Sequence, residues 1–157
     1  MGSSNRKRME RLVECAEAHF GEKVISTSAP GGEGRASWRF KLESRSIIAT
    51  LRPNFRRTHL EAFALTKIGE YCSDIPECLG VVGEIMFQSD VGDKRLNQEI
   101  VRLNKTRRVD VSHEAIAAIF RVQSAAHQAG LNEKMPHLGV NADRIENLMN
   151  SVSALEP

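Results

Sequence analysis

Apolar side chains recur along the first half of the chain with two different periods. Over residues 5–20 they return every three or four positions, which predicts an amphipathic helix ending at Gly21. Residues 24–29, 36–42 and 46–52 are β-prone instead, and Trp38, Phe40 and Leu42 alternate with polar neighbours. The pattern therefore predicts a helix followed by an antiparallel meander of three strands.

The next segments repeat this order of helix and strands. Helical periodicity returns over residues 58–71, and two further strands are expected at 79–82 and 85–88. They flank Gly83-Glu84, a two-residue loop with glycine first, as a type II′ turn requires. These residues predict a second hairpin that extends the sheet.

Beyond Asp93 the pattern predicts helices only. We expect a helix around Leu96 to Leu103, a basic loop over 104–108, a long helix capped by Ser112 that runs to Gly130, and a weaker helix over 143–155. Strands that cluster before helices indicate an α+β fold rather than an alternating α/β fold. The change of texture near residue 92 predicts two parts, 1–92 with the sheet and 93–157 with helices.

Composition is that of an ordinary globular protein. The chain has 157 residues, of which 41% are hydrophobic and 27% charged, with a net charge of +2. No apolar run has the roughly 18–20 residues of a membrane span, and the basic N-terminus lacks the apolar core of a signal peptide. Three cysteines, an odd number, suggest reduced thiols. We expect a cytoplasmic protein that does not bind a membrane, and no His/Cys metal site.

Two segments are candidates for binding phosphate. The turn 30–34 holds Gly31, Gly32 and Gly34, whose backbone N–H groups could approach phosphate oxygens, although a plain hairpin tip explains the same glycines. Residues 35–57 carry seven basic side chains and one acidic, a local charge of +6. That stretch fits either a solvated sheet face or a surface that binds a nucleotide or a polynucleotide.

The order of these pieces is more informative than any one of them. The order resembles that of a kinase-type N-lobe. It consists of a glycine turn, two strands with Arg52 near the end of the second, a helix with Glu61, a hairpin, a polar connector and helices. Residues 46–63 resemble the third strand and following helix of the aminoglycoside phosphotransferase family. Residues 75–80 are similar to the family's lead into the next strand. Residues 86–93 (MFQSDVGD) resemble its hinge segment, in the branch of hexosamine and N-acetylmuramate kinases. The resemblance spans roughly residues 10–130.

The resemblance implies roles for particular residues. Gly31, Gly32 and Gly34 would cover the phosphates of ATP, and ATP with Mg²⁺ would be the cofactor. Arg52 would stand where the family has a phosphate-contacting lysine, with Glu61 as its helix partner, and Thr50 on the same strand face is the alternative to Arg52. The adenine edge would meet the backbone of Gln88, Ser89, Asp90 and Val91.

The family's catalytic motifs are missing from this sequence. No histidine opens an H-G-D-x-x-x-x-N loop, and no later metal-binding aspartate motif follows, so no catalytic residue is assigned. We therefore expect the ATP-binding portion of a sugar or aminoglycoside kinase, inactive alone, whose substrate contacts lie outside this chain.

Two other functions remain open at this point. A degenerate kinase-like module would bind or regulate without phosphate transfer, with self-association or a C-lobe partner covering its apolar surface. A nucleic-acid-binding protein, supported by the basic stretch 35–57 alone, is the less favoured alternative.

Overall fold

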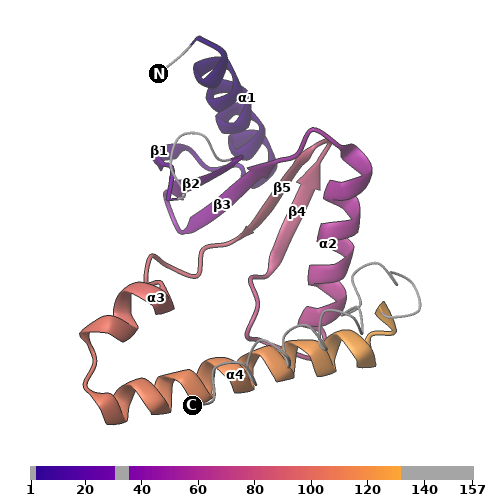
Figure 1. Cartoon of the computed structure of the whole chain (residues 1–157). Coiled ribbons are helices and arrows are strands. Elements are labelled where there is room, and N and C mark those ends of the chain that lie inside the picture. Colours follow the sequence, from indigo (N-terminus) through magenta and orange to yellow (C-terminus); the bar gives the residue numbers. More distant parts are fainter. Residues whose placement is uncertain (1–2, 31–35, 132–157) are drawn as a thin grey trace.

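The computed structural model describes residues 3–30 and 36–131 and shows an α+β fold (Figure 1). Helix α1 (Ser3–Phe20) precedes strands β1 (Val24–Ser28), β2 (Ser37–Leu42) and β3 (Ser46–Leu51). Helix α2 (Phe55–Gly69) leads to β4 (Cys78–Val82) and β5 (Ile85–Ser89). A short helix α3 (Leu96–Glu99), a 3₁₀ turn η1 (Ile100–Arg102) and the long α4 (Lys105–Gln128) follow.

The five strands form one antiparallel sheet in the order β1-β2-β3-β5-β4. The predicted α+β class with a five-stranded antiparallel sheet is therefore confirmed. The turn between β4 and β5 also has the predicted form. Gly83, the first residue of the loop, has φ +60°, whereas Glu84, like every other non-glycine residue of the described chain, has no positive φ. This combination is the one that a type II′ turn requires.

The main core lies between α1 and one face of the sheet. Leu12 and Ala16 of α1 are buried against Phe40 and Phe87, whose side chains are fully buried in the central strands. Because side chains alternate across a strand, the neighbours Arg39 and Gln88 point to the opposite face. That second face is the one against which α2 packs.

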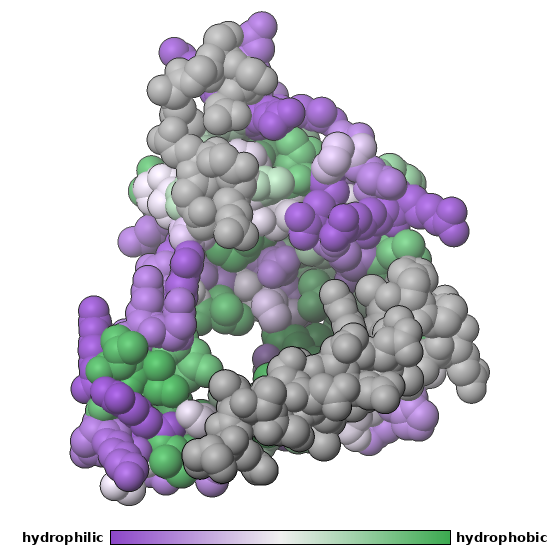
Figure 2. All heavy atoms as spheres, viewed as in Figure 1, coloured by the Kyte–Doolittle hydropathy of each residue, from purple (hydrophilic) through white to green (hydrophobic). Residues whose placement is uncertain are grey.

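Helix α4 lies at the C-terminal end of α2, away from the turn between β4 and β5 (Figure 1). In Figure 1, α4 runs across the end of α2, and α3 lies apart from the sheet at the end of the connector that follows β5, so the chain curves back on itself. Figure 2 shows an opening through the molecule between the sheet and the α3–α4 segment. An ion pair between Arg121 of α4 and Asp74 joins α4 to the α2–β4 loop.

Three expectations for the helices are corrected by the structure. Residues 104–108 are not a loop: the Asn104 side chain accepts a hydrogen bond from the Arg107 N–H at 3.0 Å and caps α4, which begins at Lys105. Ser112 is inside that helix, and its hydroxyl donates to the Arg108 carbonyl at 2.7 Å. The single helix expected over 96–103 is divided into α3 and η1. The expected helix over 143–155 and the glycine turn 31–34 lie outside the described residues.

Candidate nucleotide site

The cation and acid expected from the resemblance form an ion pair. Arg52 follows β3 directly, and its Nε donates to Oε2 of Glu61 on α2 at 3.1 Å. Both side chains are half-buried. The pair therefore joins the end of a central strand to the helix that covers it.

The start of α2 is fixed firmly enough to place Glu61. The backbone N–H of Arg52 and the hydroxyl of fully buried Thr58 both donate to the Glu84 carbonyl in the β4–β5 turn, at 3.0 and 3.3 Å. Asn54 caps the helix by accepting from the Arg57 N–H at 3.2 Å. These three hydrogen bonds orient the first turns of α2 on the sheet, so Glu61 lies over the end of β3.

A second arginine binds the same carboxylate. The Nε of Arg57, one turn before Glu61, donates to Oε1 at 3.0 Å, while Arg52 occupies Oε2. Sequence reasoning counted Arg57 only in the basic stretch and assigned it no partner. Its four-residue spacing from Glu61 on a helix was the signal that could have found this pair.

The three charged residues line a pocket between α2 and the sheet, with a volume of about 650 Å³. We call it the α2–sheet pocket. Its polar side chains are Arg52, Arg57, Glu61 and Gln88. Its apolar wall is made by Leu60, Ala64, Leu65, Ile68, Pro76 and Met86. The pocket is thus apolar over most of its lining and carries two guanidinium groups at one side, a combination suited to an organic anion.

Thr50, the alternative to Arg52, does not line this pocket. Its side chain is buried, and its Oγ1 lies 2.9 Å from the Oγ of Ser37 on the neighbouring strand β2. That hydrogen bond satisfies the hydroxyl inside the sheet. Of the two candidates on this strand face, the structure brings only Arg52 to the pocket.

The segment expected to meet an adenine edge is divided between two roles. Gln88 lines the α2–sheet pocket, whereas the Ser89 hydroxyl accepts from the Glu77 N–H at 2.8 Å and Val91 is 76% exposed. Asp90 belongs to a network of hydrogen bonds and ion pairs that the sequence did not predict. Its carboxylate accepts from Arg39 at 2.9 Å and from the Ser46 hydroxyl at 2.7 Å, and Arg39 also pairs with Asp93.

This network perturbs two ionisable groups. Burial raises the pKa of Asp90, but the hydrogen bonds from Arg39, Ser46 and the Gly92 N–H outweigh it, so the pKa lies below its usual value. The bonds to Asp90 and Asp93 raise the pKa of Arg39. The network fixes the connector after β5 to strands β2 and β3, and its one guanidinium group is shared by two carboxylates.

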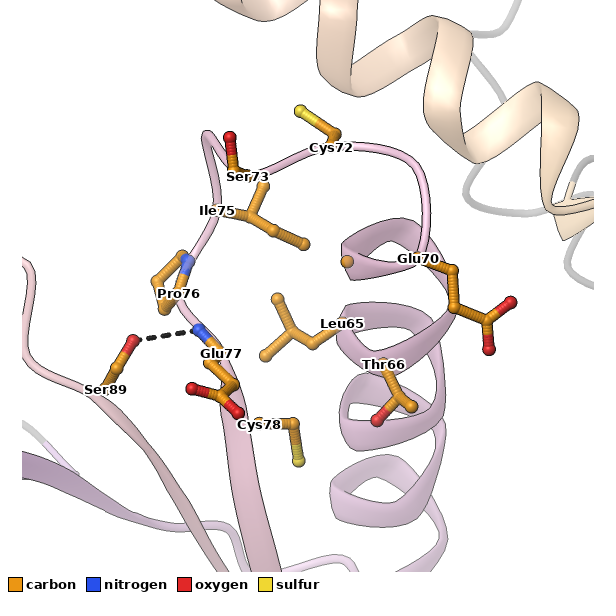
Figure 3. Close-up of a pocket in the computed structure, with 11 residues that line it drawn as sticks. Leu65, Thr66, Glu70, Cys72, Ser73, Ile75, Pro76, Glu77, Cys78 and Ser89 are labelled. Carbon is orange, nitrogen blue, oxygen red and sulfur yellow. Dashed lines mark hydrogen bonds between the residues drawn. The ribbon is translucent and has the colours of Figure 1, made fainter.

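A different pocket, about 480 Å³, lies at the other end of α2 (Figure 3). The loop after α2 forms one of its walls, and Cys72 and Cys78 are among its lining residues, as Figure 3 shows. Its ionisable carboxylates are Glu70 and Glu77, and no arginine or lysine lines it. An anion is therefore favoured in the α2–sheet pocket and disfavoured here.

Among residues 3–30 and 36–131, no group of three or more His, Cys, Asp or Glu side chains is placed to hold a metal ion. In the same part of the chain, no helix is both long and apolar enough to cross a membrane. Comparison with known proteins found no matching family model, no matching curated protein and no matching solved structure.

Proposed function

We propose that this chain is the nucleotide-binding portion of a kinase-like phosphotransferase that acts on a small molecule such as a sugar or an aminoglycoside. The observation that carries the proposal is the Arg52–Glu61 ion pair, both residues of which line the α2–sheet pocket. A cation on a central strand, oriented by a helix carboxylate, is the arrangement that kinases use to contact nucleotide phosphates. Here it adjoins an apolar pocket with one amide, Gln88, that can bond a base.

Thermal unfolding with added nucleotide tests this proposal directly. A ligand at 100 times its Kd stabilises the folded protein by about 2.7 kcal/mol, which raises the Tm by several degrees for a chain of this size. We expect this shift with ATP or ADP, measured with and without Mg²⁺. Arg52→Ala is expected to abolish the shift relative to its own ligand-free Tm. Arg56→Ala removes an exposed arginine of the first turn of α2 that does not line the pocket, and this variant is expected to keep the shift.

The outcome against the proposal is equally clear. If no adenine or guanine nucleotide shifts the Tm of the wild-type protein, nucleotide binding is rejected. If the Arg52→Ala and Arg56→Ala proteins respond alike, the nucleotide binds elsewhere and the α2–sheet pocket is not its site.

A second candidate, a kinase-like binding module that self-associates, is favoured by one feature of α4. Val109, Ile116, Ile119 and Phe120 of this helix are each 47–65% exposed. Exposed apolar side chains gathered on one helix are typical of an interaction surface. Sedimentation velocity over a wide concentration range tests the idea: Phe120→Glu is expected to shift a dimer to monomer, and a wild-type monomer at all concentrations would reject it.

A further inference from the structure

Two arginines, rather than one, line the α2–sheet pocket. Arg52 and Arg57 each use Nε to bind Glu61, at 3.1 and 3.0 Å, one on each carboxylate oxygen. The Nη groups of both arginines have no partner among the described residues. Both guanidinium groups are therefore oriented by the protein while most of their N–H donors remain available.

The position of Arg57 in its helix is unfavourable unless an anion is nearby. Arg56 and Arg57 lie in the first turn of α2, which contains no acidic residue. The N-terminal end of a helix carries a partial positive charge, so cations there are destabilising and anions are stabilising. Glu61 compensates one of the two guanidinium charges at the pocket, which leaves this group of three side chains with a net charge of +1.

We propose that Arg57 is a phosphate-binding residue, and that it holds the terminal phosphate of the nucleotide together with Arg52. This inference rests on the proposed nucleotide site and adds a residue to it. Each guanidinium offers a planar pair of donors that matches two phosphate oxygens, and Glu61 holds the two groups side by side. The base and sugar then lie against the apolar wall formed by Leu60, Leu65 and Met86.

A role of Arg57 in phosphate binding predicts that its loss changes the affinity only of ligands that carry phosphate. ADP and pyrophosphate contact both arginines, whereas adenosine contacts only the apolar wall and Gln88. Loss of the Arg57 guanidinium therefore weakens ADP and pyrophosphate and leaves adenosine unchanged. A charge-assisted hydrogen bond to phosphate corresponds to about tenfold or more in affinity.

Isothermal titration calorimetry of the full chain with ADP, pyrophosphate and adenosine tests the proposal. We expect Arg57→Ala to weaken ADP and pyrophosphate by about tenfold or more, with adenosine binding as in wild type. Arg57→Lys is expected to bind ADP and pyrophosphate with an affinity between those of wild type and Arg57→Ala, because lysine keeps the charge but loses the paired donors. Arg56→Ala is the matched control, because it removes an equal charge from the adjacent, exposed position outside the pocket. Circular dichroism of each variant verifies that α2 remains folded.

Each result has a distinct consequence. Equal ADP affinity in Arg57→Ala and Arg56→Ala overturns the role of Arg57 but leaves the nucleotide site in place. A second outcome is that the wild type binds pyrophosphate, that Arg57→Ala weakens this binding, and that ADP binds no more tightly than pyrophosphate. The arginine pair then keeps its role as a phosphate site, and the nucleotide is rejected as its ligand. If neither ADP nor pyrophosphate binds the wild type, both proposals are rejected.

Discussion

Gly80 in β4 is the position where the fold is least tolerant of an added methyl group. Its φ is +148°, and the register of β4 against β5 shifts between Cys78 and Gly80. A Cβ at this position would lie 2.4 Å from Nε2 and 2.7 Å from Cε1 of His19, near the end of α1. The His19 ring stacks on Phe87 with centroids 5.3 Å apart, and its Nε2 lies 3.3 Å from the Leu79 carbonyl oxygen. Gly80→Ala therefore perturbs the contact between α1 and the sheet.

Two costs add up in this variant. A non-glycine residue held in such a backbone conformation is strained by about 1–3 kcal/mol. The His19 ring is exposed enough to rotate away from the new methyl group, and it then loses its stacking on Phe87, worth about 0.5–1.5 kcal/mol. We expect Gly80→Ala to lower the free energy of unfolding by about 2–4 kcal/mol, a large part of the 5–15 kcal/mol typical of a domain.

Urea unfolding of four proteins separates the two costs: wild type, Gly80→Ala, His19→Ala and the double variant. Removing the His19 ring leaves the methyl group nothing to displace, so only the backbone strain remains. The cost of Gly80→Ala should then be smaller in the His19→Ala background, with a coupling of about 1 kcal/mol and an unchanged slope against urea. A Gly80→Ala protein as stable as wild type would refute the strained backbone, and equal costs in both backgrounds would refute the steric contact.

Three further variants test other parts of the fold. Asp90→Asn removes a carboxylate whose pKa is lowered in the folded state, so the stability that ionised Asp90 supplies is present near neutral pH and is lost as pH falls below about 4. Its unfolding free energy at neutral pH should fall by about 2 kcal/mol, and a Tm series from neutral to acidic pH should fall less steeply than in wild type. Asn104→Ala removes the cap of α4 and should cost about 1 kcal/mol in urea unfolding. Arg121→Ala breaks its pair with Asp74, but the two side chains are 51% and 32% exposed, so thermal unfolding should show a loss below about 1 kcal/mol.

The sheet could be predicted well because its pattern is local. Trp38, Phe40 and Leu42 alternate with polar residues, and all three are buried on the α1 face. Gly83 leads a two-residue loop, and only a few backbone geometries close such a hairpin. In both cases the decisive information lies within a few residues of the chain.

The start of α4 was predicted wrongly because two residues can each cap a helix. Asn104 and Ser112 are both favourable N-caps, and the basic residues between them suggested a loop. Lysine and arginine have good helix propensity, however, and the Asn104 side chain satisfies the Arg107 N–H. Ser112 therefore lies inside the helix, and its hydroxyl donates to the Arg108 carbonyl. The sequence alone gives no preference between Asn104 and Ser112 as the N-cap.

Long-range hydrogen bonds explain the remaining differences at the site. Thr50 and Arg52 share a strand face by parity, yet the Thr50 hydroxyl is bonded to Ser37 on β2, thirteen residues away. Likewise Arg39 and Asp90 are 51 residues apart, and neither residue type by itself indicates the partner. Strand register decides both contacts, and register depends on the whole sheet.

The candidate site therefore has a local half and a non-local half. Arg52, Arg57 and Glu61 lie within ten residues of one another, joined by hydrogen bonds that the connection from β3 to α2 sets. Met86 and Gln88 reach the same pocket only because β5 pairs with β3. If the phosphates bind the local half and the base binds the non-local half, substitutions in the two halves should act almost independently on ADP affinity. Pyrophosphate then reports on the arginine pair alone, and the additional affinity of ADP measures what the apolar wall and Gln88 contribute.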